Sequence, residues 1–143
     1  MQYVRYIAER TDKKRLFDAD ALNIIAGEHI DYKGSREGQI IITPHIMEMS
    51  RLTGKTVADI KEHMIESAKE YAIQHSCICI LKDARTVVTD GQKVYINCTG
   101  NDGMSTGGCG DVLTGLIAGM TAMGLDAFEA ACLSVYVHGK AGD

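Results

Sequence analysis

Residues 100–119 constrain the fold of this chain more than any other segment. They read GNDGMSTGGCGDVLTGLIAG, with glycines at positions 100, 103, 107, 108 and 110. Glycine adopts positive φ at little cost, so the backbone N–H groups of such a loop can point into one concavity. A helix is expected to start near Asp111, and the unpaired N–H groups and dipole at its N-terminus favour an anion there. The segment predicts a phosphate-binding loop; a glycine-rich turn that serves packing alone is the structural alternative.

The glycine segment differs from a Walker loop and also predicts how its helix packs. A Walker loop needs a lysine at the position that Cys109 occupies. Gly115 and Gly119 lie within the helix expected from Val112 to Met123. Two glycines in this helix are expected to thin it for close packing against another element.

Apolar periodicity predicts an α/β layered domain with a mainly parallel sheet. Gln39–Thr43 is a β-branched run typical of a buried parallel strand, and it stops at Pro44. The other elements expected are a helix over 3–9, a strand end at 16–17, a loop over 34–38, a helix over 56–75, a strand over 77–81, a hairpin of 86–89 and 93–97 with a primed turn at Asp90-Gly91, and helices over 112–123 and 127–139. Residues 1–143 are read as a single, partial domain.

Composition excludes several function classes. The chain has 143 residues and a formal charge of −4, which argues against a nucleic-acid partner because phosphate backbones demand a basic surface. No stretch approaches the roughly 20 apolar residues that cross a bilayer, and no export signal is visible, so a membrane partner is not expected. Cys77 and Cys79 alternate in an apolar run, so buried, reduced thiols are expected there rather than a metal site. Reduced thiols in turn favour the cytoplasm as the compartment.

The end of the 39–43 strand carries a second candidate site, Thr43-Pro44-His45-Ile46-Met47-Glu48. Ligands of open α/β sheets bind outside the carboxyl ends of the strands. His45 can donate to a substrate, and Glu48, one helical turn later, can order a hydrated Mg²⁺. The alternative is a helix-start histidine with a solvated glutamate. Asp18 and Asp20, after Phe17, either face the cleft or cap a short helix.

Charged residues after the 77–81 strand and at the glycine loop are further candidates. Lys82 and Arg85 offer positive charge for phosphates, although Lys-Asp-Ala-Arg is also an ordinary turn. Asp111 has two competing roles. As a helix-start residue it stabilises the dipole and caps N–H groups; beside a phosphate it accepts a proton from a substrate hydroxyl.

Taken together and in order, these segments resemble the ADP/ATP-dependent NAD(P)H-hydrate dehydratase family of the ribokinase-like superfamily. The matching stretches are DADALN (18–23), ITPHIMEMSRLTG (42–54), ILKDARTVV (80–88), GNDGMSTGGCGDVLTGLIAGM (100–120) and HGKAGD (138–143). The resemblance implies a ribokinase-like three-layer α/β/α fold, incomplete here at the N-terminal side and the C-terminus. It also implies a lyase that repairs hydrated NADH or NADPH at the expense of ADP or ATP with Mg²⁺.

The resemblance implies roles for individual residues. Asp111 acts as the catalytic base, and His45 and Asp111 contact the hydrated nucleotide. Glu48 stays a candidate, from its position alone, for a water-mediated contact with Mg²⁺, and the full-length form is expected to be a homo-oligomer. The residues implied in binding ADP or ATP are Lys82, Asp83, Ala84, Arg85, Thr86, Gly107, Gly108 and Gly110.

This chain departs from the family pattern in three ways. Ile46 and Met47 replace a proline and a glycine, Asp83 replaces a glycine, and family domains are longer. A side chain at position 83 is expected to crowd the nucleotide or to change φ there. A truncated chain is expected to be inactive if the missing part is essential. Two alternatives are a small-molecule kinase of the hydroxyethylthiazole-kinase type and a non-catalytic remnant that only binds.

Overall fold

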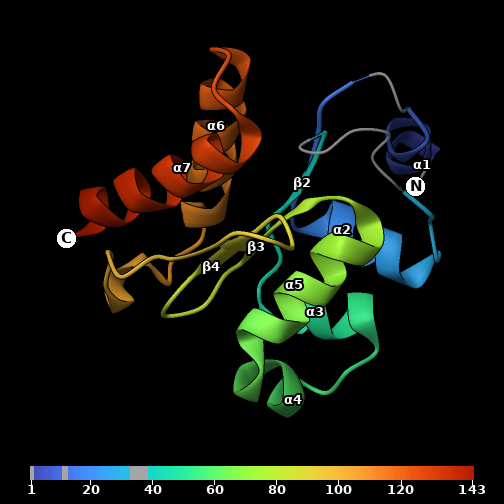
Figure 1. The fold of residues 1–143 in the computed structure, drawn as a ribbon, viewed down its shortest axis with the longest axis horizontal. Helices are drawn as coiled ribbons and strands as arrows, with labels where there is room; N and C mark the ends of the chain where they lie inside the picture. The colour runs from blue at the N-terminus through green and yellow to red at the C-terminus, as the bar shows by residue number, and fades with distance from the viewer. Residues whose placement is uncertain (1, 11–12, 33–38) are drawn as a thin grey trace.

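The computed structural model describes residues 2–10, 13–32 and 39–143, and these form an α/β/α arrangement (Figure 1). The loop expected over 34–38 lies outside the described residues. Five strands form one sheet in the order β1-β2-β3-β4-β5. Their bounds are Arg15–Phe17 for β1, Ile40–Ile42 for β2, Ile78–Leu81 for β3, Val87–Thr89 for β4 and Val94–Ile96 for β5.

The sheet is mixed, and four of its five strands run in the same direction. β1, β2 and β3 pair in parallel, with Leu16 opposite Ile41 and Ile42 opposite Cys79. β4 is antiparallel to both β3 and β5, so β5 runs in the same direction as β3. The predicted α/β class with a mainly parallel sheet is confirmed.

Helices cover both faces of the sheet. Figure 1 shows α6 and α7 on one side of the strands and α2 to α5 on the other. The bounds are Gln2–Ala8 for α1, Asp20–Gly27 for α2, Ile46–Thr53 for α3, Val57–Glu62 for α4, Met64–His75 for α5, Cys109–Ala122 for α6 and Ala127–Gly142 for α7, with a 3₁₀ turn, η1, at Asp102–Met104.

Alternation along the strands divides the core into two clusters. In β3, Cys79 and Leu81 belong to the cluster under α1 to α5, whereas Ile78 and Ile80 pack with Leu113 of α6 and other residues of the second helical layer. This follows from the two-residue period of a strand, which sends successive side chains to opposite faces. A strand buried on both faces appears in the sequence as a continuous apolar run, and β3 has that pattern.

Two local expectations are corrected by the structure. The helix expected over 56–75 is broken at His63, where φ is −126° and ψ is 50°. Both pieces still direct apolar residues into the same core cluster, including Ile60 and Ala68, so the periodicity continues across the break. The hairpin exists, but Thr89 pairs with Val94, so its loop has four residues rather than a two-residue primed turn. The Asp90 carboxylate accepts from the N–H groups of residues 92 and 93 and stabilises this longer loop.

Cys77 and Cys79 are buried free thiols, as expected. Burial raises the pKa of Cys77 to about 12 and that of Cys79 well above its ordinary value. Both therefore stay protonated and act as small apolar side chains. Among the described residues, no helix is long and apolar enough to span a membrane.

Candidate functional site

Three of the candidate segments begin where β2, β3 and β5 end. Because these strands run in the same direction, their carboxyl ends lie at one edge of the sheet. His45 and Lys82 form a parallel bridge there, and the Lys82 N–H donates to the Pro44 carbonyl at 2.8 Å. The glycine segment follows β5 to the same edge. The expectation that these segments meet at the carboxyl edge is confirmed.

A cleft of about 650 Å³ opens at this edge. Its walls come from the segment after β3, from the loop between β5 and α6, and from α7. His45, Lys82 and Gly110 all line it, as the sequence predicted. The lining residues are His45, Lys82, Asp83, Ala84, Thr86, Asn97, Thr99, Gly100, Asn101, Asp102, Met104, Ser105, Thr106, Cys109, Gly110, Leu113, Val135, His138 and Gly139. A cleft of this size accommodates a nucleotide.

Lys82 lies at the base of this cleft. Its Nζ is 2.9 Å from Asp18 Oδ1, and Thr114 Oγ1 donates to Asp18 Oδ2 at 2.7 Å. Burial alone would raise the pKa of Asp18, but hydrogen bonds from Thr43, Thr114 and Lys82 together outweigh burial and lower it. A Cβ on Gly110 would lie 3.7 Å from Lys82 Nζ, so the ammonium is close to the first turn of α6.

The glycine segment forms a loop with a short 3₁₀ turn and ends at α6. The helix begins at Cys109, two residues before the expected start near Asp111. Gly100 and Gly108 have φ of 97° and 92°, whereas Gly103, Gly107 and Gly110 do not need positive φ. Gly108 is the N-cap and provides no side-chain hydrogen bond to the helix start. The first N–H groups of α6 therefore lack a side-chain cap, which favours an anion at this position.

Asp111 lies in the first turn of α6, and its side chain is exposed. It is not the N-cap, because Gly108 holds that position. In the part of the chain that the structure describes, the cleft lining includes Gly110 but not Gly107, Gly108 or Asp111. Asp111 thus directly follows a lining residue, and its two alternative roles remain predictions.

His45 and Glu48 form a capping box at the start of α3. Glu48 N–H donates to His45 Nδ1 at 3.2 Å, and His45 N–H donates to Glu48 Oε2 at 2.8 Å. Of the alternative reading, the helix-start histidine is confirmed, since His45 is the N-cap, but the solvated glutamate is wrong, because Glu48 is buried and its carboxylate completes the cap. The His45 side chain is half-exposed and lines the cleft. Ile46, where the family has a proline, packs in the core, and Met47 faces solvent.

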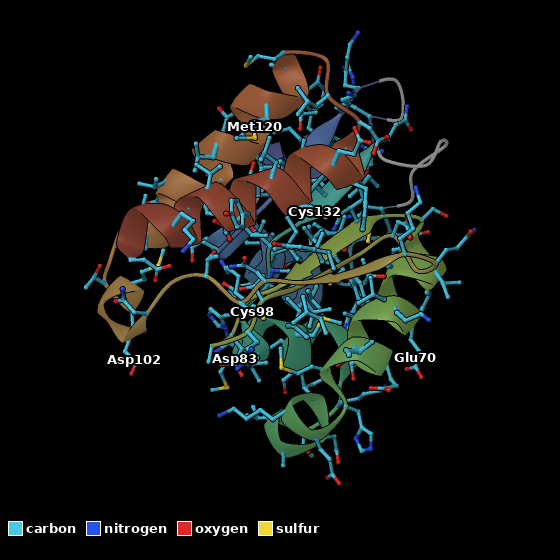
Figure 2. The ribbon with its side chains drawn as sticks, turned by 60° about the vertical axis from the view of Figure 1, so that its left-hand side comes forward. Glu70, Asp83, Cys98, Asp102, Met120 and Cys132 are labelled. Atoms are coloured by element: carbon cyan, nitrogen blue, oxygen red, sulfur yellow. The ribbon has the colours of Figure 1, made fainter. Side chains whose placement is uncertain are left out.

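The segment after β3 forms a turn whose residues separate into two groups. Lys82, Asp83, Ala84 and Thr86 line the cleft, whereas Arg85 donates from Nη1 to Cys98 Sγ at 3.1 Å. Figure 2 shows Asp83 and Cys98 in the region between the two helical layers. Positive φ at non-glycine described residues is confined to Ala19, His29 and Ser76. Asp83 therefore replaces the family glycine without backbone strain.

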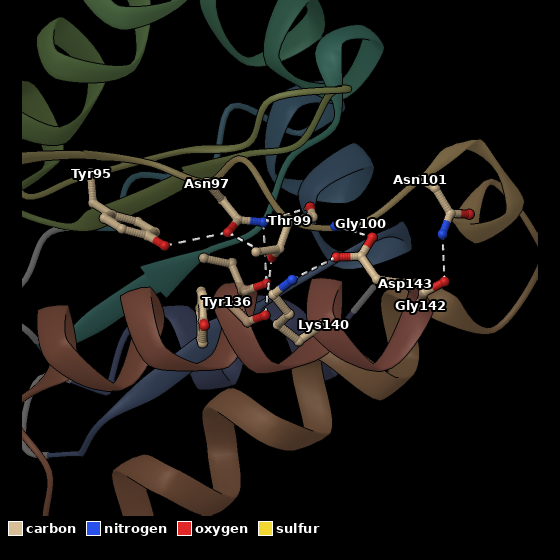
Figure 3. A network of polar contacts seen from close by, with 10 residues as sticks. Tyr95, Asn97, Thr99, Gly100, Asn101, Tyr136, Lys140, Gly142 and Asp143 are labelled. Atoms are coloured by element: carbon tan, nitrogen blue, oxygen red, sulfur yellow. Dashed lines mark hydrogen bonds and ion pairs between the residues drawn. The ribbon is translucent and has the colours of Figure 1, made fainter.

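Sequence reasoning missed the contribution of α7 to the cleft. Asn97 Nδ2 donates to the Val135 carbonyl at 3.3 Å, and Thr99 Oγ1 donates to the Tyr136 carbonyl at 3.0 Å (Figure 3). Gly100 N–H donates to the Asp143 carboxylate at 3.1 Å. The loop that leads into the glycine segment is thus fixed to the C-terminal half of α7. The HGKAGD motif at 138–143 was the available signal, but nothing in it pointed to residues 97–100 as its partner.

Gly139 explains how α7 approaches the loop so closely. A Cβ at this position would lie 2.1 Å from Thr99 Oγ1, closer than real side chains come. By contrast, a Cβ on Gly115 or Gly119 would meet nothing within 4 Å among the described residues. The close packing expected at those two glycines is wrong for this part of the chain, whereas Gly139 is a position where close packing does require glycine.

His138, next to Gly139, also lines the cleft. Burial lowers its pKa, and a backbone hydrogen bond with Cys109 acts in the opposite direction. The neutral imidazole is therefore favoured at neutral pH. His138 joins α7 to the first residue of α6, so both helices contribute to one wall.

Comparison with known proteins gives consistent results. A model of the family described as NAD(P)H-hydrate dehydratase matches residues 2–143. The bifunctional NAD(P)H-hydrate repair enzyme of Moorella thermoacetica is 47% identical over 142 residues, which are 98% of this chain and 26% of that enzyme. The chain therefore spans about a quarter of this curated relative.

Solved structures support the same fold. The ADP/ATP-dependent NAD(P)H-hydrate dehydratase of Bacillus subtilis, co-crystallised with ATP and Mg²⁺, is 33% identical with a TM-score of 0.75 and covers 87% of this chain and 43% of that one. A ribokinase-like superfamily protein of Enterococcus faecalis is 24% identical with a TM-score of 0.84, covering 97% and 48%. The ribokinase-like fold class is confirmed, over about half of each solved chain.

Proposed function

We propose, since this chain belongs to the NAD(P)H-hydrate dehydratase family, that it forms the nucleotide-binding part of a lyase that restores hydrated NADH and NADPH at the expense of ADP or ATP. The observation that carries the proposal is the cleft at the carboxyl edge of the sheet. There Lys82 and the uncapped start of α6 lie together, and His45 lines the same cleft. A cation beside helix N–H groups suits the phosphates of a nucleotide.

The chemistry proceeds in two steps. First, the terminal phosphoryl group moves from ADP or ATP to the ring hydroxyl of the hydrate, releasing AMP or ADP. Asp111 accepts the hydroxyl proton, and the N–H groups at the start of α6 stabilise the charge on the transferring phosphoryl group. Second, phosphate leaves with the help of the ring nitrogen, the neighbouring carbon loses a proton, and the dihydronicotinamide is restored.

The proposed substrate and nucleotide contacts come from different walls. His45 and Asp111 contact the hydrate, and the segment Lys82–Thr86 contacts the adenine nucleotide together with the loop at Gly107, Gly108 and Gly110. His45 is preorganised for this because Glu48 fixes its backbone and its ring. The end of the Lys82–Thr86 segment is joined to the end of β5, because the Thr86 carbonyl accepts from Asn97 N–H at 2.9 Å.

A Mg²⁺ ion at this cleft would have few side-chain ligands from the described residues. They contain no group of three or more His, Cys, Asp or Glu side chains arranged to hold a metal. The Glu48 carboxylate, the predicted water-mediated contact, is already bonded to His45. Mg²⁺ commonly enters sites of this kind with the phosphates and keeps most of its waters. We propose that Mg²⁺ accompanies the nucleotide, and we derive no step through it.

Two further features of the proposal concern the setting of the protein. The cysteines Cys77, Cys79, Cys98, Cys109 and Cys132 are all free, which supports a reducing cytoplasmic compartment. The exposed apolar side chains of α6 and α7 support a homo-oligomer in the longer protein. They include Val112, Leu133 and Tyr136, and Met123 at the C-cap of α6 is exposed as well.

The test is to incubate the purified chain with hydrated NADH, ADP or ATP, and Mg²⁺. Recovery of NADH absorbance with equal release of inorganic phosphate supports the dehydratase. A phosphorylated product that persists, without NADH, indicates a kinase of the hydroxyethylthiazole type instead. Nucleotide binding without either product indicates a module that binds but does not catalyse.

A further inference from the structure

We propose that Asp18 is a positioning residue that holds the Lys82 ammonium beneath the start of α6, so that Lys82 meets the phosphates of the bound nucleotide. This inference rests on the proposed function and gives a specific role to Asp18, which the sequence left either facing the cleft or capping a short helix. Asp18 follows β1, Lys82 follows β3, and Thr114 lies on α6. One carboxylate therefore connects three elements that are far apart in the sequence.

Both carboxylate oxygens of Asp18 are used in this arrangement. Oδ1 accepts from Lys82 Nζ at 2.9 Å, and Oδ2 accepts from Thr114 Oγ1 at 2.7 Å. The side chains of Lys82 and Asp18 are 23% and 11% exposed, so water competes only weakly for the pair. A lysine side chain has about four rotatable bonds, so fixing it in advance removes an entropic cost that nucleotide binding would otherwise include.

The order of the groups decides what a phosphate would meet. Lys82 lines the cleft, whereas Asp18 is not among its lining residues in the described part of the chain. Of this ion pair, Lys82 is therefore the member that lines the cleft. An ammonium has three donors, and one is used by Asp18, which leaves two for phosphate oxygens. Gly110 lies directly beside the pair, because a Cβ there would be in ordinary contact with Lys82 Nζ at 3.7 Å and with Asp18 Oδ2 at 3.9 Å.

Asp18 also affects the placement of α6 itself. Thr114 lies one turn after Gly110, so its bond to Asp18 fixes the helix start relative to Lys82. The phosphate-binding N–H groups and the ammonium are thereby held at a constant separation. Loss of the carboxylate is expected to release both groups at once, and to affect ligands that carry phosphate more than ligands that do not.

The experiment compares the affinities of ADP and adenosine by calorimetry, on the full chain. The variants are Asp18→Asn, Lys82→Met and the double substitution. Asp18→Asn is expected to weaken ADP binding about tenfold, the size expected for losing one charge-assisted contact, and to leave adenosine binding within about twofold. In the Lys82→Met background, Asp18→Asn is expected to cause almost no further loss.

A matched control and a second variant complete the test. Glu70 pairs with Lys55 at 2.7 Å on the surface, so Glu70→Gln removes the same charge far from the cleft and should leave both affinities unchanged. Thr114→Val keeps the ion pair and removes one restraint. It should weaken ADP binding about threefold, and it keeps the proposal testable if Asp18→Asn fails to fold.

Several results would overturn the proposal or its basis. If Asp18 had only a structural role, its loss would weaken ADP and adenosine binding equally, or the losses in the double variant would be additive, and either result overturns the proposal. Tighter ADP binding by Asp18→Asn also overturns it, since Asp18 would then compete with phosphate. A wild-type chain that binds neither ligand is a different result and overturns the proposed function, and the positioning role with it.

Discussion

At the scale of single residues, Asp111 shows how position limits the roles open to a side chain. It follows Cys109 and Gly110 in the first turn of α6, and Gly108 is the N-cap. A carboxylate there stabilises the helix dipole whether or not it takes part in catalysis. Stability alone therefore does not separate the two roles, and the rate of the reaction does.

We expect Asp111→Asn to lower the conversion of hydrated NADH by about 10²–10⁴-fold, while ADP affinity stays within a few-fold. Asparagine keeps the size of the side chain but does not accept the hydroxyl proton. Steady-state absorbance and calorimetry measure the two quantities. Asp20→Asn is the matched control, because Asp20 is also exposed in the first turn of a helix, α2. Turnover by Asp111→Asn within a few-fold of wild type would leave Asp111 with a structural role only.

Asp18 gives a prediction about acid stability. Its pKa is below the ordinary value of 3.8 because hydrogen bonds from Thr43, Thr114 and Lys82 outweigh burial. A carboxyl of this kind contributes stability above its unfolded pKa and loses it as the pH falls through the folded pKa. Between about pH 5 and about pH 2, Asp18→Asn should therefore lose less free energy of unfolding than wild type. Urea unfolding at each pH measures the difference, and parallel curves would contradict it.

At the scale of elements, α7 holds the loop that forms one wall of the cleft. Gly139→Ala should lower the free energy of unfolding by about 1–3 kcal/mol, because the new Cβ would overlap Thr99. Gly115→Ala is the matched control on α6, where a Cβ meets nothing within 4 Å. It should raise stability by about 0.5–1 kcal/mol, because alanine favours helix. Chemical denaturation measures both, and similar values for the two variants would show that α7 does not need a glycine.

Most elements could be predicted because their signals are local. β2 and β3 are continuous apolar runs, and α6 follows a glycine loop directly. The break at His63 could not be predicted, because apolar spacing continues through it and only the packing of α4 and α5 reveals it. The four-residue hairpin loop was missed because Asp90-Gly91 fits a primed turn equally well until the Asp90 hydrogen bonds are seen.

At the scale of the whole molecule, the cleft depends on contacts between distant parts of the chain. His45, Lys82 and the glycine loop could be placed together from sequence, since each follows a strand of the same direction. The Asp18–Thr114 bond and the loop contacts of α7 could not, because hydrogen bonds between distant side chains leave no periodic pattern. The predictable part of the site is therefore its edge of the sheet, and the remainder comes from how the two helical layers close around that edge.

This construction predicts a global response to nucleotide. The cleft has walls from the segment after β3, the glycine loop and α7, so a ligand that binds only the folded chain should stabilise both helical layers together. At 100 times its Kd, ADP should raise the free energy of unfolding by about 2.7 kcal/mol. Amide hydrogen exchange should slow by about 100-fold both in β3, which lies under α5, and in α7. The reason is that the slowest amides of both elements exchange through global unfolding. Adenosine at the same multiple of its own Kd is the control and should give the same increment. Protection confined to residues 100–110 would show instead that the loop binds ADP locally, without coupling the two layers of the fold.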